Sequence, residues 1–388
     1  MKKFLALLLA LVMSLSLVAC GGGSDTTTDE GNDTEGGDTP EAASYQVAMI
    51  TDYGDITDQS FNQTTYEACQ EFCDAEGLQF EYYKPAGDST AERVAMVDAA
   101  VADGYNVIVM PGYAFAETIK ETAELYPDVT FIALDVAQGD LDPNGEGYTL
   151  PSNVYCAVYQ EELCGYMAGY AAVKLGYTHL GVLGGMAVPA VQRFGYGFVQ
   201  GADAAAVEMG IADQVVMEYA YGNQFYGDAD ITAYMDNWYQ TLGVQVVFAS
   251  GGGIYTSAAE AAAKVGGKLI GVDVDQSANI NTYGEGMCVT SAMKGLAETV
   301  KHMLSEVVAG NFANYGGKIE TLGLVNGDDP TANYVQLPME TTQWGDGFTQ
   351  DDYKALVKAM YDGEVTVSND ISAMPATTIT VNFAGNIK

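Results

Sequence analysis

The chain has 388 residues, 48% of them hydrophobic, and its 15 basic and 52 acidic residues give a formal net charge of −37. This length and hydrophobic content are typical of a globular protein with room for two domains, and they exclude a wholly disordered chain. The negative charge repels nucleic acid and anionic lipid head groups, so it argues against DNA binding and favours a neutral ligand over an anionic one.

The first twenty residues have the pattern of a lipoprotein signal peptide. Lys2 and Lys3 precede an apolar run over residues 4–18, which leads into Leu17-Val18-Ala19-Cys20, the pattern of a lipobox. Because the apolar run is short for a bilayer span, we expect cleavage before Cys20 and lipidation of this cysteine, rather than an uncleaved membrane anchor.

Residues 21–44 consist mainly of Gly, Ser, Thr, Asp and Glu. Such a segment buries too little apolar surface to fold, so we expect it to be a disordered acidic tether. The folded part of the chain is therefore expected to begin near Tyr45.

From Tyr45 onward, short apolar runs alternate with longer amphipathic segments, and this alternation predicts α/β units with parallel sheets. The first unit is predicted to contain strands at residues 47–50, 79–83, 107–110, 130–134 and 153–158, and helices at residues 60–76, 90–103 and 114–126. The second is predicted to contain strands at residues 180–183, 214–219, 245–249 and 268–272, and helices at residues 161–174, 190–209, 228–242 and 255–265. Two similar units in one chain argue for two lobes.

The remaining part of the chain is predicted to return to the first lobe and to end in the second. Its predicted elements are a strand at residues 287–290, a helix at 293–308, strands at 319–325 and 332–336, a helix at 349–360 and a strand at 377–381. We therefore assign residues 45–155 and about 287–322 to the N-terminal lobe, and residues 156–286 and about 323–388 to the C-terminal lobe.

A polar turn between Thr51 and Gln63 lies after a predicted strand and before a predicted helix, where open α/β sheets bind ligands. The turn offers three carboxylates, side-chain amides and one aromatic side chain that is expected to be exposed, Phe61. These groups suit a small molecule with a flat face and several hydroxyls or ring nitrogens. The alternative is a capped helix start, with Asp58 or Ser60 as the N-cap.

Polar or glycine-rich residues follow other predicted strands as well. If the two sheets face each other, these strand ends line one cleft, so we expect a ligand between the lobes. The glycine loop at residues 250–253 lacks the ending of a P-loop and favours backbone contact with a sugar or other polar ligand, a plain tight turn being the alternative. The strand ends concerned are Asp52, Pro111-Gly112-Tyr113, Asp135, Gly184-Gly185-Met186, Ser250-Gly251-Gly252-Gly253 and Asp273.

Asp273 and Lys294 are candidate site residues from the second half of the chain. Asp273 suits the vicinal hydroxyls of a ligand, with a helix N-cap as the alternative. Lys294 is expected to neutralise Asp273, to bind a ligand oxygen or to lie at the surface. A calcium loop starting at Asp273 is improbable, because Ala278 and Gly284 replace its required glycine and glutamate.

Sequence signals for metal binding and catalysis are missing. The six cysteines and two histidines show no zinc spacing, and the chain contains neither Gly-x-Ser-x-Gly nor His-Glu-x-x-His. We therefore predict a protein that is not an enzyme and holds no metal or cofactor. The five cysteines other than Cys20 are expected to be mostly buried thiols.

Several motifs occur in a characteristic order and spacing. They are Asp52-Tyr53-Gly54-Asp55-Ile56-Thr57-Asp58-Gln59-Ser60-Phe61-Asn62-Gln63, Gly184-Gly185-Met186, the stretch at 194–201, Ser250-Gly251-Gly252-Gly253, Gly271-Val272-Asp273-Val274-Asp275-Gln276 and Thr290-Ser291-Ala292-Met293-Lys294. With these motifs, nearly all of the chain from Tyr45 resembles the basic membrane protein family of lipoproteins, and it is similar to substrate-binding proteins of the purine nucleoside receptor A type.

The resemblance implies a type I periplasmic-binding fold, in which two Rossmann-like lobes with parallel sheets are joined by a three-segment hinge and close on a ligand. It also implies that a nucleoside base stacks between Phe61 and a second aromatic residue, either Phe225 or Tyr226. It assigns contacts with the base edge or sugar to Asp52, Asn62 and Asp135, and ribose contacts to Gly252, Asp273 and Lys294.

Together these features predict a lipid-anchored, monomeric substrate-binding protein of an ABC importer on the extracytoplasmic face of the cell membrane. It would capture a nucleoside, by preference a purine nucleoside, and deliver it to a permease and its ATPase, with no role for nucleic acid. A sugar- or autoinducer-type receptor and a sensory module would use the same two lobes. An exported nucleoside hydrolase is a further alternative.

Overall fold

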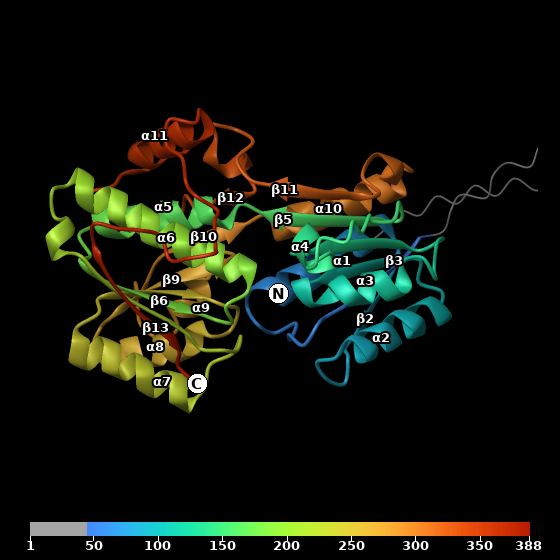
Figure 1. The fold of residues 1–388 in the computed structure, drawn as a ribbon, viewed down its shortest axis with the longest axis horizontal. Helices are drawn as coiled ribbons and strands as arrows, with labels where there is room; N and C mark the ends of the chain where they lie inside the picture. The colour runs from blue at the N-terminus through green and yellow to red at the C-terminus, as the bar shows by residue number, and fades with distance from the viewer. Residues whose placement is uncertain (1–44) are drawn as a thin grey trace, which may run out of the picture. The chain divides into compact units, whose positions relative to one another are not determined.

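The computed structural model describes residues 45–388, which Figure 1 shows as two groups of α/β elements. The predicted signal peptide, the lipidation site Cys20 and the tether at residues 21–44 lie outside the described residues. Within residues 45–388, no helix combines the length and apolar character needed to cross a membrane.

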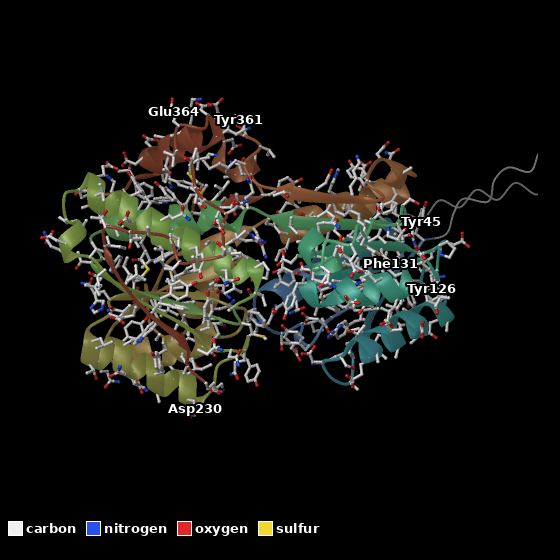
Figure 2. All side chains as sticks on the ribbon, viewed as in Figure 1. Tyr45, Tyr126, Phe131, Asp230, Tyr361 and Glu364 are labelled. Carbon is white, nitrogen blue, oxygen red and sulfur yellow. The ribbon has the colours of Figure 1, made fainter. Side chains whose placement is uncertain are left out.

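The first lobe is built on a six-stranded parallel sheet in the order β11-β5-β4-β3-β1-β2. Its central strands are runs of apolar residues because helices cover both faces of the sheet. Phe131 of β4, for example, is fully buried (Figure 2). The strands are β1 (Gln46–Ile50), β2 (Gln79–Tyr83), β3 (Val107–Pro111), β4 (Thr130–Leu134), β5 (Val154–Tyr159) and β11 (Lys318–Leu322).

The helices of the first lobe follow the strands as the sequence predicts. In α2, for example, the side chain of Ser89 accepts a hydrogen bond from the backbone of Glu92 and so caps the first turn. The helices are α1 (Phe61–Glu76), α2 (Thr90–Ala102), η1 (Tyr113–Phe115), α3 (Ala116–Thr122), α4 (Gln138–Leu141), α10 (Leu296–Val308) and η4 (Phe312–Asn314). Helix α10 packs against α1, so it belongs to this lobe as predicted.

The second lobe is built on a seven-stranded sheet in the order β12-β10-β9-β8-β6-β7-β13. Every pairing in it is parallel except that of β12 with β10. The strands are β6 (His179–Gly184), β7 (Val216–Tyr221), β8 (Val246–Ser250), β9 (Lys268–Asp273), β10 (Cys288–Lys294), β12 (Val335–Gln336) and β13 (Thr380–Asn386). The helices are α5 (Glu161–Lys174), α6 (Pro189–Glu208), η2 (Ala212–Gln214), α7 (Ala229–Asp236), η3 (Asn237–Leu242), α8 (Tyr255–Ala263), α9 (Ser277–Ile280), η5 (Pro330–Ala332) and α11 (Gln350–Tyr361).

The five main strands of each lobe have the same order, β2-β1-β3-β4-β5 in the first and β7-β6-β8-β9-β10 in the second. This is a doubly wound order, which places ligand sites beyond the carboxyl ends of the strands. The chain passes between the two sheets three times, after β5, after β10 and after β11. The predicted type I periplasmic-binding fold with a three-segment hinge is confirmed.

The lobe assignment is wrong at two places. Residues 156–159 are predicted in the C-terminal lobe, but they form the later part of β5 and pair with β4 and β11 of the first sheet. Residues 287–290 are predicted in the first lobe, but β10 runs to Lys294 and pairs in parallel with β9 of the second sheet. The chain crosses to the first lobe only afterwards, at Gly295, so α10 starts at Leu296 rather than at residue 293. An apolar run does not encode which sheet it joins, because that choice depends on the side chains it meets in the core.

Helices α5 and α6 of the second lobe pack at unusually short range (Figure 1). Gly165 and Gly169 of α5, and Gly197 and Gly201 of α6, face the backbone of the opposite helix. A Cβ atom at any of these positions would clash with a carbonyl oxygen across the interface. The glycines are therefore required for close approach of the two helices.

Candidate ligand-binding cleft

A cleft lies between the carboxyl ends of the two sheets and contains about 820 Å³ of empty space, its open mouth included. Residues of both lobes line it. All eight residues predicted from the sequence to bind ligand border this one cleft: Asp52, Phe61, Asn62, Asp135, Phe225, Gly252, Asp273 and Lys294. The structure thus brings these residues together, while the role of each toward a ligand stays a prediction.

Asp52 follows β1 and is held by the backbone of its own turn. Its Oδ1 atom accepts hydrogen bonds from the backbone N–H groups of Tyr53 (2.6 Å) and Gly54 (2.8 Å). Burial raises the pKa of Asp52 to about 6, although these two hydrogen bonds lower it. Gly112 packs against this carboxylate, because a Cβ there would lie 2.5 Å from Oδ2.

Asp58 organises the start of α1. Its two carboxylate oxygens accept hydrogen bonds from the backbone N–H groups of Ser60, Asn62 and Gln63, at 2.9 to 3.1 Å. The Asn62 side chain also donates to Asp58, at 3.0 Å. Of the two predicted capping residues, Asp58 therefore binds the first turn of the helix, whereas Ser60 makes no side-chain capping bond.

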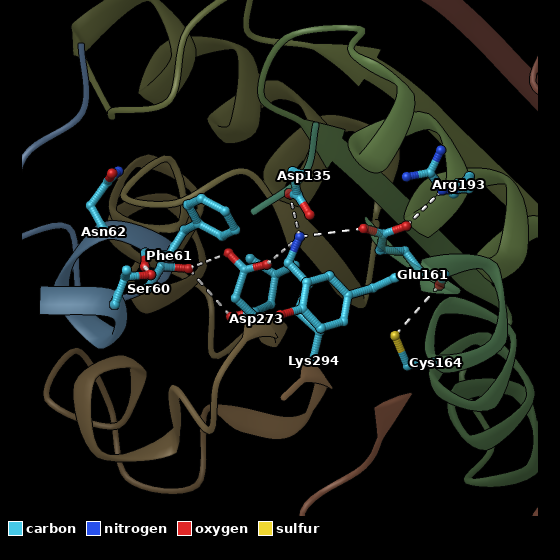
Figure 3. A network of polar contacts seen from close by, with 12 residues as sticks. Ser60, Phe61, Asn62, Asp135, Glu161, Cys164, Arg193, Asp273 and Lys294 are labelled. Atoms are coloured by element: carbon cyan, nitrogen blue, oxygen red, sulfur yellow. Dashed lines mark hydrogen bonds and ion pairs between the residues drawn. The ribbon is translucent and has the colours of Figure 1, made fainter. Parts of the chain in front are cut away.

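Ser60 instead connects the two lobes. Its hydroxyl donates a hydrogen bond of 2.6 Å to Oδ2 of Asp273, which lies at the end of β9 (Figure 3). A second contact between the lobes lies close by, where the Gln276 side chain donates to the backbone oxygen of Gln59 at 3.1 Å. Burial raises the pKa of Asp273 to about 6, although Lys294 and the Ser60 hydroxyl lower it.

Lys294 lies at the centre of a buried cluster of charges (Figure 3). Its Nζ atom is 2.6 Å from Oδ2 of Asp135 in the first lobe and 3.3 Å from Oε1 of Glu161. The same ammonium is 3.8 Å from Oδ1 of Asp273. Burial alone lowers the pKa of Lys294, but the attraction of the three carboxylates outweighs it and raises the pKa above its usual value. The lysine is therefore charged and joins the two lobes.

Sequence reasoning missed two members of this cluster, Glu161 and Arg193. Glu161 is fully buried at the start of α5, and its Oε2 atom accepts a hydrogen bond of 2.6 Å from Nε of Arg193 on α6. Both residues lie on helices, so a search of strand ends does not find them. The sequence offers one signal for Arg193, which is that the chain has only 15 basic residues.

Asp135 and Asp273 occupy equivalent places in the two lobes, immediately after β4 and at the end of β9. Both have left-handed backbone conformations, with φ of 61° and 65°. Such a conformation costs a non-glycine residue about 1–3 kcal/mol and is found mainly at functional sites. The paired strain therefore supports a functional role for both carboxylates.

Two aromatic rings border the cleft from opposite lobes. Phe61 begins α1, and the ammonium of Lys294 lies 4.7 Å from the centre of its ring. Phe225 lies in the loop between β7 and α7. Its neighbour Tyr226 is 64% exposed and borders only an outer cavity, so Phe225 is the better placed of the two aromatic residues proposed for stacking.

The glycine loop holds the backbone of the Phe225 loop. The N–H of Gly253 donates a hydrogen bond of 3.0 Å to the carbonyl oxygen of Phe225, and a β-bridge joins Tyr226 to Gly253. Gly252 has a φ of 55°, which favours glycine. This loop therefore positions an aromatic wall of the cleft, in addition to the ligand contact predicted for it.

The prediction that the cysteines are buried thiols is confirmed, since Cys69, Cys73, Cys156, Cys164 and Cys288 are all buried and free. Within the part of the chain that the structure describes, no group of three or more His, Cys, Asp or Glu side chains is arranged to hold a metal ion.

Comparisons with known proteins concern the family and the fold of the chain. The chain is 27% identical to a CD4+ T-cell-stimulating antigen of Listeria innocua, over 82% of this chain and 87% of that protein. It is 24% identical to the ABC transporter nucleoside-binding protein BmpA of Lactococcus lactis subsp. cremoris, over 92% and 98%. An ABC transporter solute-binding protein of Conexibacter woesei shares the fold, with a TM-score of 0.63 and 24% identity, over 84% of this chain and 99% of that one.

The family model of PnrA-like ABC transporter substrate-binding proteins, named Bmp, matches residues 45–328. This match spans both lobes and includes all eight residues predicted to bind ligand, so the resemblance noted from the sequence motifs is confirmed. The chain belongs to the Bmp family of PnrA-like ABC transporter substrate-binding proteins.

Proposed function

We propose that this protein captures a nucleoside, by preference a purine nucleoside, in the cleft and delivers it to an ABC permease and its ATPase. The observation that carries the proposal is a set of unpaired polar atoms on residues that border the cleft, which is also lined by an aromatic ring from each lobe. Asn62 Oδ1, Asp135 Oδ1 and Ser250 Oγ are buried there without a hydrogen-bond partner in the described part of the chain. Buried polar atoms are normally paired, so these three are candidates for ligand contacts.

The rings and acceptors suit a nucleobase. Phe61 and Phe225 supply one flat apolar surface from each lobe, and stacking on an aromatic side chain contributes about 1–3 kcal/mol per base. Asn62, Asp52 and Asp135 supply oxygen acceptors, which match the ring N–H and amino groups of a purine.

Three other residues that border the cleft suit a ribose. Asp273 offers a carboxylate to paired hydroxyls, Lys294 offers an ammonium to a ligand oxygen, and Gly252 allows close approach of the backbone. The cleft contains more carboxylates than cations, so we expect it to favour the neutral nucleoside over its phosphorylated forms.

We further propose that the protein acts as a monomer held at the extracytoplasmic face of the cell membrane by a lipid on Cys20. The lipobox pattern and the acidic residues at 21–44 support this part of the proposal. The anchor would keep the lobes near the permease.

Calorimetry tests the proposed ligand. Inosine, guanosine and adenosine are expected to bind the purified protein at micromolar concentration or below, more tightly than uridine and cytidine. Phe61→Ala is expected to weaken binding about 5- to 150-fold through loss of one stack.

An assay for free base is expected to show retention of intact nucleoside, whereas turnover would indicate a hydrolase. If no nucleoside binds at micromolar concentration, the nucleoside proposal is wrong; full affinity of Phe61→Ala would favour a sugar ligand.

Binding is expected to weaken as the pH falls below about 6. The pKa values of Asp52 and Asp273 are about 6 without ligand, and ligand N–H and O–H donors favour the ionised carboxylates. Binding should therefore release protons, and each linked group should reduce affinity by up to about tenfold per pH unit below its pKa. Calorimetry between about pH 7.5 and 4.5 measures this slope, and Asp52→Asn should make it shallower. A constant affinity over this range would contradict the assigned roles.

A further inference from the structure

Tyr53 makes an aromatic contact across the cleft. It lies in the first lobe immediately after Asp52, and its ring stacks on that of Phe225 in the second lobe. The ring centroids are 6.1 Å apart and the ring planes are inclined by 26°. This distance and angle are those of a favourable offset stack.

The Tyr53 hydroxyl also contacts both lobes. It lies 3.2 Å from the hydroxyl of Tyr113 in the first lobe and donates to the sulfur of Met186 in the second, at 3.6 Å. One side chain therefore carries both an aromatic and a polar contact between the lobes.

Phe225 contacts both Tyr53 of the first lobe and the backbone of its own lobe. A Cβ atom at Gly185 would lie 2.5 Å from the Phe225 ring, so the ring rests closely on this glycine. The glycine loop fixes its backbone from another side through the bond from Gly253. The contact with Tyr53 is the part of this support that comes from the opposite lobe.

The two rings also border two cavities. Tyr53 and Phe225 border the inner cleft and also an outer cavity of about 1290 Å³, its open mouth included. The outer cavity is lined further by exposed or polar residues such as Tyr226 and Gln224. The stacked pair is therefore part of the lining that the inner cleft and this outer space share, together with Gly54, Asp58 and Asn62.

The backbone of Tyr53 is tied to a candidate ligand contact. Its N–H donates to Oδ1 of Asp52, so the orientation of Asp52 and the position of the Tyr53 ring depend on the same turn. A ligand that binds Asp52 would therefore stabilise the turn from which Tyr53 reaches the second lobe.

We propose that Tyr53 is a positioning residue that latches the two lobes together and holds Phe225 in place as a wall of the cleft. The part of this proposal that concerns ligand release rests on the proposed function, whereas the part that concerns lobe closure does not. Opening of the lobes must break the stack and the sulfur contact. The latch therefore favours the closed form and slows escape of a ligand into the outer cavity.

Lobe closure is tested without any ligand. Spin labels on Glu76→Cys and Ala263→Cys report opening, because α1 and α8 both begin at the cleft and these exposed positions lie at their far ends. The added cysteines are expected to label first, because the five native ones in the described part are buried. Pulsed EPR on a Cys20→Ser background is expected to show a longer interlobe distance with Tyr53→Ala, and nearly the original distance with Tyr53→Phe, which keeps the ring. Equal distances in all three proteins would overturn the latch.

Ligand release is tested by stopped-flow kinetics with the tightest-binding nucleoside. Tyr53→Ala is expected to dissociate about two- to tenfold faster, the range for loss of one aromatic pair. Tyr53→Phe should restore most of the original rate, and Tyr361→Ala on α11 is the matched control remote from the cleft (Figure 2). An unchanged rate in Tyr53→Ala would overturn the positioning role. If no nucleoside binds any of the proteins, the proposed function fails, but the EPR distances still decide the latch.

Discussion

Replacing Lys294 by methionine is expected to lower the free energy of unfolding by about 3–5 kcal/mol, the cost of leaving buried charges without their partner. Asp135, Glu161 and Asp273 all lie within 3.8 Å of its ammonium, and Glu161 is fully buried. Arg193 would remain as a partner for Glu161 alone. Ligand binding should be lost as well, because repulsion among the carboxylates would drive the lobes apart at the cleft.

Urea unfolding at neutral pH measures the loss, and Lys301→Met provides the matched control. Lys301 pairs with Glu71 at 2.6 Å, but their side chains are 42% and 67% exposed, so the control should change stability by less than about 1 kcal/mol. Adding Asp135→Asn to Lys294→Met should recover part of the lost stability, since it removes one unpaired carboxylate. Equal effects of the two lysine substitutions would show that the cluster contributes nothing beyond a surface ion pair.

The fold was largely predictable because its elements differ in local pattern. Fully buried strands such as β3 and β4 are short apolar runs, and longer amphipathic segments lie between the strands, so this alternation predicts their order along the chain. The pattern of apolar residues does not show which neighbouring strand each strand pairs with. The run that forms β10 reads the same whether it pairs with a strand of the first sheet or with β9 of the second.

The candidate site was predictable for a different reason. In a parallel sheet the carboxyl ends of the strands lie at one edge. Asp52, Asp135 and Asp273 follow or end such strands, so they lie close together if the two sheets face each other. Glu161 and Arg193 were not predictable in this way, because they reach the cleft from two helices. The local sequence predicts Ser60 as the N-cap of a helix. Its hydroxyl instead donates a hydrogen bond to Asp273, more than two hundred positions away in the sequence.

Gly201→Ala is expected to lower the free energy of unfolding by about 3 kcal/mol, at the upper end of the range for overpacked cores. Its new methyl group would clash with the carbonyl oxygen of Tyr166 on the opposite helix. Because the clash involves backbone atoms, a change of side-chain rotamer cannot relieve it, and the two helices must separate. Gly139→Ala is the matched control, since a Cβ there meets no atom within 4 Å and the stability should change by less than about 1 kcal/mol.

The same substitution should also weaken ligand binding, because α5 and α6 carry the two residues of the Glu161–Arg193 pair. Moving the helices apart lengthens the 2.6 Å contact between Glu161 and Arg193. Glu161 then keeps Lys294 as its remaining positively charged partner. Urea unfolding and calorimetry on one preparation of Gly201→Ala measure both effects. A variant that loses stability but keeps full affinity would show that the helix interface supports the lobe without positioning its charges. A loss of both would mean that the spacing of two buried helices sets the electrostatics of the cleft.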